Sequence, residues 1–213
     1  MIDIEKLTAL AIAYDAGDAK RIQHFIKVYA YSRLLGRREG LDEQKQNILE
    51  AAAVLHDIGI HEAERKHGSS GGHWQEMEGP AVAAPMLQQC GADERESERV
   101  QWLIAHHHTY TAGEEKDFRI LLEADFLVNA YEDGMTAEQC KTAKDRVFRT
   151  ETGKQYLEKC FSNRHIRRNN RKLRMETPTA VGVQRATAHR AALSKSEWRM
   201  NPEVGHSPFF HFY

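Results

Sequence analysis

The sequence predicts an all-α fold: a compact bundle of about six to seven helices, followed by a poorly ordered C-terminal extension. Apolar side chains recur at helical spacing in successive segments up to about residue 161. Capping and turn residues separate these segments, and no segment shows the alternating pattern of a β-strand. Because the periodicity stops after Phe161, we expect a helical domain over residues 1–161 and an irregular tail over residues 162–213.

The first three predicted helices carry strong patterns. One spans residues 2–14, and the next spans residues 19–38 with Asp18 as its N-cap. The second helix has apolar side chains on two faces, so it should be mostly buried. The third begins at Asp42 and ends at Gly59, after the apolar run AAAVL.

Four further helices complete the prediction. They cover residues 80–89, a segment that begins at Asp93, residues 117–131 and residues 136–161. The Gly and Ser residues of KHGSSGG predict a loop over residues 66–72. The helix over residues 117–131 is so apolar that we expect it to be buried nearly all round.

The composition is typical of a soluble domain. The 213 residues are 41% hydrophobic and 29% charged, and the net charge of −1 favours neither nucleic acid nor a membrane as a partner. Three widely spaced cysteines without a CxxC motif argue against disulfides and against a zinc site built from cysteine. The sequence has no secretion signal and no apolar stretch of about 20 residues, so we expect a cytoplasmic protein.

The tail over residues 162–213 has a different charge balance. It carries ten Lys or Arg and three Asp or Glu, whereas the preceding residues are acidic overall. The run RHIRRNNRKLR could contact nucleic acid through phosphate groups. Solvation, contact with an acidic surface, or a non-native extension are the alternative interpretations of this segment.

Four polar residues lie in apolar surroundings and predict a metal site. Asp125 stands inside the helix LLEADFLV, Asp57 follows AAAVLH, and His24 lies on an apolar stripe. A buried, isolated carboxylate is costly, and a cation shared with His56 would stabilise all four side chains. Taken singly, Asp125 could form a buried salt bridge and His24 could be a core histidine. Imidazole and carboxylate ligands suit Mn, Fe, Ni, Co or Zn, with Mg also a candidate.

In these residues the sequence resembles the HD-domain superfamily of metal-dependent phosphohydrolases. The family motif is a His, then a His-Asp pair, then a distant Asp, and it matches His24, His56, Asp57 and Asp125 over about residues 20–160. The resemblance implies an all-helical domain that binds a divalent metal at these residues. It also implies hydrolysis of a phosphoester, with a nucleotide or another small phosphorylated molecule as the substrate class.

The resemblance implies further histidines near the metal, in many relatives as ligands of a second ion. The run IAHHHTY offers His106 as the best match and His107 as the next, because a continuing helix could not turn all three toward one site. His108 is then expected in a loop or on the surface. The family's other extra histidine falls near Gln75 or Glu76 in this sequence, and His73 is displaced from that position. A carboxylate could take its place, and Glu76 and Glu78 are the candidates.

The resemblance also implies catalytic roles. Asp57 would orient the attacking water and accept its proton, and His106 or His107 would stabilise the leaving oxygen. Many relatives have a lysine where this sequence has Ile60, so phosphate contacts must come from other residues. The candidates are His61, Lys66 and Arg21.

Two other functions fit the same residues. Some relatives are di-iron oxygenases, and a site rich in histidine and carboxylate could hold two irons. A non-catalytic regulatory module that binds a nucleotide is the other alternative. An oligomer is compatible with the sequence, which does not specify the substrate or the metal.

Overall fold

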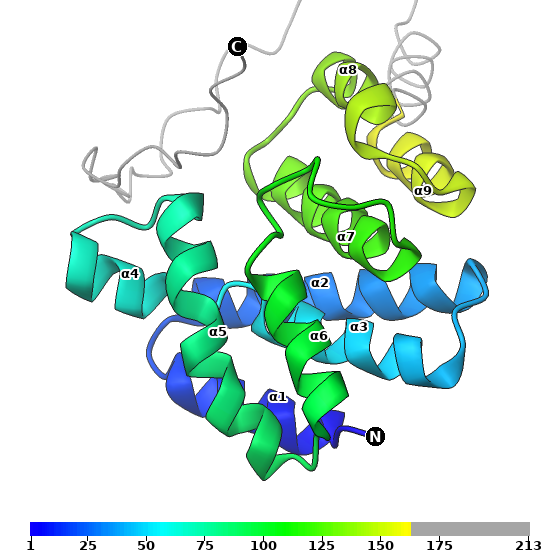
Figure 1. Cartoon of the computed structure of the whole chain (residues 1–213). Helices are drawn as coiled ribbons and strands as arrows, with labels where there is room; N and C mark the ends of the chain where they lie inside the picture. The colour runs from blue at the N-terminus through cyan, green and yellow to red at the C-terminus, as the bar shows by residue number, and fades with distance from the viewer. Residues whose placement is uncertain (163–213) are drawn as a thin grey trace, which may run out of the picture. The chain divides into compact units, whose positions relative to one another are not determined.

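The all-α prediction is confirmed. In the computed structural model, residues 1–162 are described, and they form nine α-helices and no strand (Figure 1). The predictions for the tail lie outside the described residues, apart from Ser162. The helices are α1 (Ile4–Tyr14), α2 (Ala19–Arg38), α3 (Glu43–Leu55), α4 (Ile60–His67), α5 (Gly72–Gln89), α6 (Glu94–Ile104), α7 (Lys116–Glu132), α8 (Ala137–Val147) and α9 (Glu151–Phe161).

Short polar side chains begin most of these helices. At each of six N-termini, the side chain of the N-cap residue accepts a hydrogen bond from a backbone N–H of the first turn, which stabilises a helix by about 1 kcal/mol. These residues are Asp3, Asp18, Asp42, Asp93, Thr136 and Thr150. The capping prediction for Asp18 and Asp42 is therefore confirmed.

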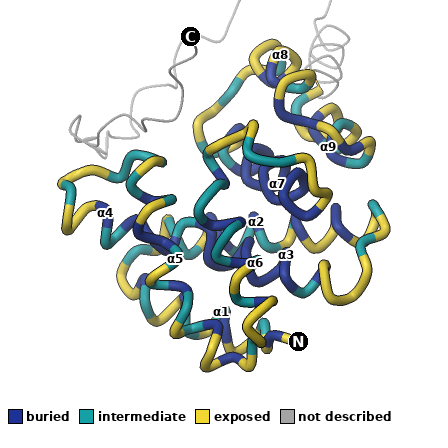
Figure 2. The backbone as a smooth tube through the Cα atoms, viewed as in Figure 1, coloured by how far each residue is buried: buried dark blue, intermediate teal, exposed yellow. Residues whose placement is uncertain are grey.

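Helices α2, α3 and α7 form the centre of the domain. Helix α2 packs against both α3 and α7, and α3 also contacts α6 and α7. Helix α7 is buried without interruption from Asp117 to Val128, as its apolar sequence predicts, and α3 is buried over its last eight residues (Figure 2). Polar groups on these three helices therefore meet deep in the fold.

Two helices differ from the prediction because local composition was misleading. Helix α4 occupies residues 60–65, for which no element was predicted, and the first two residues of the predicted loop; it ends at His67 and is capped by Gly68, whose φ of +64° suits glycine. Helix α5 begins at Gly72, so the predicted loop over 66–72 is shorter, and Pro80 lies inside the helix instead of at its start. Packing against α4 and α6 stabilises α5 despite its two prolines, Pro80 and Pro85.

The predicted helix over residues 136–161 is two helices, α8 and α9. Phe148 adopts an extended backbone conformation, and Thr150 then caps α9. The buried carboxylate of Glu123 accepts hydrogen bonds from the backbone N–H groups of Arg149 and Thr150, at 2.6 and 2.8 Å. A tertiary contact from α7 thus stabilises a break that the local sequence does not reveal. None of the nine helices is long and apolar enough to cross a membrane.

Candidate metal centre

The turn after α3 places the His-Asp pair at the centre of the domain. The apolar end of α3 is buried, so His56 at its C-cap is fully buried as well. Asp57 follows in the turn, and 21% of its side chain is exposed. Asp57 is therefore the member of the pair that a water molecule or a substrate could reach.

Two glycines let α5 approach this turn closely. A Cβ on Gly59 would lie 2.6 Å from the carbonyl oxygen of Gln75 and 2.7 Å from the nitrogen of Gly79. A Cβ on Gly79 would in turn lie 2.5 Å from a methyl carbon of Ile104. Only glycine fits both positions, and the start of α5 is thereby held against the turn that carries Asp57.

Helices α2 and α7 supply His24 and Asp125. His24 lies on the buried face of α2, and Asp125 lies in the fully enclosed middle of α7. The Nε2 atom of His24 is 3.1 Å from Oδ1 of Asp125. Asn129, one turn further along α7, donates a second hydrogen bond to the same oxygen at 2.8 Å.

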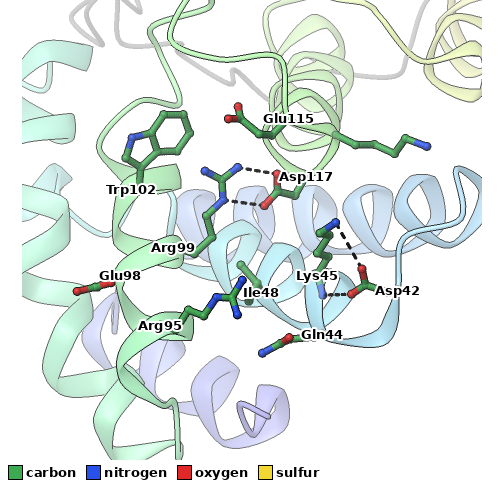
Figure 3. Close-up of a pocket in the computed structure, with 11 residues that line it drawn as sticks. Asp42, Gln44, Lys45, Ile48, Arg95, Glu98, Arg99, Trp102, Glu115 and Asp117 are labelled. Carbon is green, nitrogen blue, oxygen red and sulfur yellow. Dashed lines mark hydrogen bonds and ion pairs between the residues drawn. The ribbon is translucent and has the colours of Figure 1, made fainter.

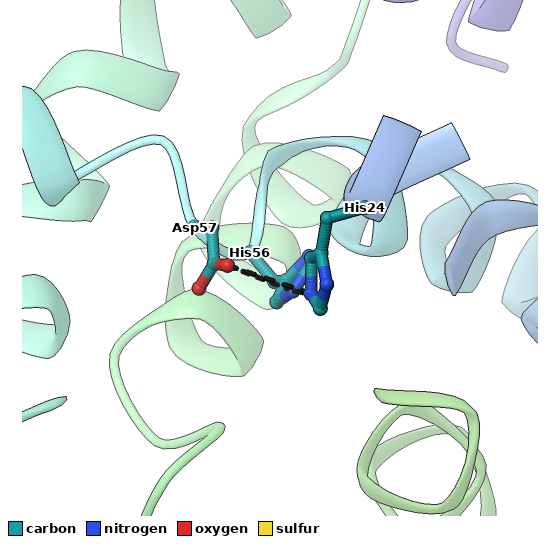
Figure 4. A group of neighbouring side chains, drawn as sticks. All are labelled: His24, His56 and Asp57. Carbon is teal, nitrogen blue, oxygen red and sulfur yellow. Dashed lines mark hydrogen bonds and ion pairs between the residues drawn. The ribbon is translucent and has the colours of Figure 1, made fainter. Parts of the chain in front are cut away.

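The four side chains that the sequence singled out lie close together: His24, His56 and Asp57 form one possible metal-binding group, and Asp125 contacts its two histidines. Nε2 of His24 lies 3.2 Å from Nε2 of His56 and 3.5 Å from Oδ2 of Asp57 (Figure 4). Nε2 of His56 lies 3.5 Å from Oδ2 of Asp57 and 3.6 Å from Oδ1 of Asp125. Ligands that stand about 2.1 Å from a metal ion are separated from each other by roughly 3 to 3.5 Å. These donor atoms therefore fit a divalent cation.

Electrostatics keeps the two carboxylates ionised. Burial alone would raise the pKa of Asp57, but His56, His107 and His24 hold it well below its usual value. The pKa of Asp125 is also lowered, because the neighbouring His24 and His56 outweigh its burial. Ionised carboxylates are the form that binds a cation.

The backbone orients two of the histidines. Nδ1 of His56 donates to the carbonyl oxygen of Ala53 at 3.0 Å, and Nδ1 of His107 donates to that of Ile104 at 2.7 Å. A histidine with its Nδ1–H occupied presents Nε2 to a ligand. Both rings therefore point their free nitrogen toward Asp57.

The histidine run does not follow the order that the sequence suggested. Helix α6 ends at Ile104, so the three histidines lie in a turn and are not spaced by 100° steps. His106 folds back on α6, where its ring stacks on Trp102 at 4.4 Å and its Nδ1 bonds to the Trp102 carbonyl oxygen at 2.7 Å. His107, by contrast, is buried, with Nε2 3.3 Å from Oδ1 of Asp57. The structure thus brings His107, and not His106, to the other predicted ligands.

His108 lies in the turn after α6, in keeping with the loop or surface position expected for it, and it belongs to a second group of possible ligands. Donor atoms of Asp57, His107 and His108 all lie within 4.8 Å of one another. Burial, followed by the neighbouring His107, lowers the pKa of His108 to about 3, so its ring is neutral and can bind a cation. Asp57 is shared with the first group, since its two carboxylate oxygens face different histidines.

Helix α5 supports this second group from the other side. Gln75 is buried, and its Oε1 lies 3.0 Å from Nε2 of His108. Oε1 of Glu76 accepts a hydrogen bond from the backbone N–H of His108 at 2.9 Å. Glu78 is turned away toward α4, where it pairs with Lys66 and with His67. His73 contacts the ring of Trp74.

The residues considered for phosphate contacts have partners of their own. Arg21 bonds to His61 at 2.8 Å and to Glu64 at 2.7 Å, and His61 also pairs with Asp15 at 3.0 Å. Lys66 is bound to Glu78. These contacts join the C-cap of α1 with α2, α4 and α5, so each of the three residues already has a partner within the domain.

A separate pocket of about 800 Å³ lies between α3, α6 and the start of α7. Its walls carry both charges, and Arg99 forms a two-pronged ion pair with Asp117 inside it, at 2.7 and 2.9 Å (Figure 3). None of the candidate metal ligands lines this pocket.

Sequence reasoning missed three residues that contact the candidate ligands. Gln75 contacts His108, Asn129 contacts Asp125, and Glu132 contacts His24. The spacing of the last two from Asp125, at i+4 and i+7, is the signal that places them on the same face of α7.

Comparisons with known proteins identify the family of this fold. The sequence matches the family model of the HD domain over residues 21–149. A search of curated proteins finds no match. The crystal structure of a predicted HD superfamily hydrolase from an uncultured Thermotogales bacterium is similar, with a TM-score of 0.53 and 24% sequence identity. The similarity covers 81% of this chain and 91% of that chain, and it shows a common fold.

The matched range contains all four residues of the central cluster: His24, His56, Asp57 and Asp125. Since the match also spans more than half of the sequence, the chain belongs to the HD domain family.

Proposed function

We propose that this protein hydrolyses a phosphoester of a small molecule, such as a nucleotide or another phosphomonoester or phosphodiester. The observation that carries the proposal is the convergence of four donor atoms from His24, His56, Asp57 and Asp125, with one carboxylate partly exposed. The cation is Mn, Fe, Ni, Co, Zn or Mg, in keeping with nitrogen and oxygen ligands. When bound, it supplies a water of lowered pKa and polarises a phosphoryl oxygen.

Residues of the chain supply the proton transfers. The Asp57 carboxylate is ionised and partly exposed, so it can orient the attacking water and accept its proton. The neutral ring of His108 and the buried ring of His107 stand beside it and are placed to stabilise the leaving oxygen. This assignment keeps Asp57 and His107 from the sequence-based set and replaces His106 with His108.

The second group, which shares Asp57, also bears on the di-iron alternative. Together the two groups offer six ligands, which is enough for two cations. An iron-dependent oxygenase would consume O₂ with a suitable substrate, whereas a hydrolase would not. A regulatory module would bind a nucleotide without releasing phosphate.

A phosphate-release screen tests the proposal. The purified protein is incubated with nucleotides and simple phosphoesters in the presence of Mn²⁺, Co²⁺, Ni²⁺, Mg²⁺ or Fe²⁺, and Asp57→Ala is run in parallel. We expect cation-dependent release by the native chain and none by the variant, with the helical circular dichroism of the two alike. Full activity in Asp57→Ala, or nucleotide binding without turnover in every metal, would contradict the proposal.

A further inference from the structure

Glu132, at the C-terminal end of α7, occupies an unusual place beside the metal centre. Its Oε2 lies 3.0 Å from Nδ1 of His24, and its Oε1 lies 2.5 Å from Nζ of Lys27. His24 and Lys27 are three residues apart on α2 and so share one face of that helix. One carboxylate of α7 thus bridges two side chains of α2, and 17% of it is exposed.

Three of the histidines near Asp57, namely His24, His56 and His107, differ in what holds their Nδ1 atoms. His56 and His107 each donate to a backbone carbonyl of their own segment, three residues back. His24 is held by a charged side chain from a different helix. A carboxylate behind a ligating imidazole fixes the ring and makes its other nitrogen a stronger donor than a carbonyl does.

The same face of α7 also controls Asp125. Asn129 donates to Oδ1 of Asp125 at 2.8 Å, and this is the oxygen that faces Nε2 of His24. Residues 125, 129 and 132 lie at i, i+4 and i+7, so they form one stripe on α7. In this stripe, Asn129 orients the candidate ligand Asp125. Glu132 orients His24, which lies beside Asp125. The stripe sets the angle between His24 and Asp125 across the α2–α7 interface.

We propose that Glu132 is a positioning residue of the metal centre: its carboxylate fixes His24 with Nε2 directed at the cation and strengthens that nitrogen as a ligand. The inference rests on the cation site of the proposed function and not on the identity of the substrate. The pair with Lys27 is more exposed, since 38% of the lysine side chain is accessible. Exposed ion pairs contribute little, so the contact with His24 is the functional one.

Calorimetric titration of the purified protein with Mn²⁺ tests this role without any substrate. Glu132→Ala should weaken Mn²⁺ binding by about 10-fold to 100-fold, as expected for the loss of a partner behind a ligand. Glu132→Gln should lose less, because its amide oxygen still accepts the Nδ1 hydrogen. Two variants serve as controls. Lys27→Met removes the exposed ion pair, and Glu138→Gln removes a charge from the exposed start of α8. The Mn²⁺ affinity of both variants should stay within about threefold of that of the native chain.

A second readout separates positioning from general destabilisation. In the Zn²⁺-loaded protein, ¹⁵N-edited spectra of the imidazole rings should show His24 with its hydrogen on Nδ1, and this signal should disappear or broaden in Glu132→Ala while that of His56 is unchanged. Native affinity in Glu132→Ala, or an equal loss in Lys27→Met, would overturn the inference. Failure to release phosphate would leave these results intact and count against the proposed function alone.

Discussion

At the residue scale, the site depends on charges that are stable only together. Burial would lower the pKa of the His24 ring, but hydrogen bonds to Asp125 and Glu132 raise it to about 11. The free cluster therefore contains a protonated His24 between carboxylates. A cation that binds Nε2 of His24 must displace this proton.

This proton predicts the pH dependence of cation binding. The pKa of His24 is raised, so its ring is protonated across the neutral range. As pH rises, a larger fraction of His24 loses this proton, and the neutral ring is the form that binds a cation. We expect the Mn²⁺ affinity to rise from about pH 6 to about pH 8, with release of a proton that calorimetry in buffers of different ionisation enthalpy can count. A flat affinity without proton release would show that His24 is not a ligand.

The sequence singled out the candidate ligands that interrupt apolar helices, and it did not distinguish among the three histidines of the turn after α6. Asp125 and His24 stand out because each interrupts an apolar stripe, and this contrast is visible in one dimension. The choice among His106, His107 and His108 depends on where α6 ends. Since helix ends are set by tertiary contacts as well as by local residues, the ring that reaches Asp57 could be known only from the fold.

At the element scale, a close contact between α5 and the His-Asp turn supports the second group of candidate ligands, Asp57, His107 and His108. Gly59 has φ −75° and ψ −12°, a conformation open to alanine, so its requirement for glycine is purely steric. The atoms that crowd it are backbone atoms of α5, which cannot move aside as a side chain could. A larger residue at this position must push α5 away from the His-Asp turn.

Gly59→Ala should therefore lower the free energy of unfolding by about 1 to 3 kcal/mol, the usual cost of overpacking. Gly71→Ala is the matched control, because its Cβ would meet nothing closer than 3.4 Å. Its cost should stay below about 1 kcal/mol. Urea denaturation of the three proteins makes the comparison, and equal stabilities would contradict the close contact.

The break between α8 and α9 tests a different element contact. Glu123 is fully buried and accepts hydrogen bonds from two backbone N–H groups and from the hydroxyl of Thr150, at 2.5 Å. Glu123→Ala leaves these donors without a partner and should cost about 2 to 4 kcal/mol. Glu123→Gln keeps an acceptor and should cost much less in the same denaturation experiment. If both variants lost the same free energy of unfolding, the charge of Glu123 and not its hydrogen bonds would be the stabilising feature.

The pKa of Glu123 gives this pair of variants a pH signature. Burial raises the pKa of its carboxyl, although hydrogen bonds from Thr150 and Arg149 oppose the shift. When the pKa of a group is higher in the folded state than in the unfolded state, the free energy of unfolding falls as pH rises from the unfolded pKa toward the folded pKa. The native chain should show this decline above about pH 4.5, and Glu123→Gln should lack it.

The accuracy of the helix predictions followed the strength of the apolar pattern. Both ends of α2 and α7 and the start of α3 were predicted to within a residue because burial imposes a clear periodicity on these helices, whereas α3 ends at Leu55, before the predicted Gly59. Helix α4 and the start of α5 were missed because they are polar and flanked by Gly and Ser, residues that also form loops. The division of α8 from α9 was missed because its cause, Glu123, lies on α7.

At the scale of the whole molecule, the candidate metal centre is assembled from residues of the described part of the chain. Residues 1–162 form one compact unit, with its own hydrophobic core around α2, α3 and α7. All candidate ligands and the residues that orient them lie within it. The helical domain over residues 1–161 therefore stands as a proposal that truncation can test.

A chain that ends at Ser162 should fold and bind Mn²⁺ as the full chain does. We expect its melting temperature to stay within about 4 °C of the full-length value, a shift that corresponds to less than about 1 kcal/mol in a domain of this size. Scanning calorimetry and Mn²⁺ titration provide the comparison. A sharp fall in melting temperature or in affinity would show that residues after Ser162 belong to the working fold.

The central claim is that His24, His56, Asp57 and Asp125 hold a divalent cation. Its most direct test is the metal content of the purified protein after exposure to Mn²⁺ and removal of free metal, measured by mass spectrometry for the native chain and for Asp125→Ala. The native chain should retain about one equivalent or more, and the variant should retain almost none while its circular dichroism stays helical. Equal metal content in the two proteins, or none in either, would contradict the claim.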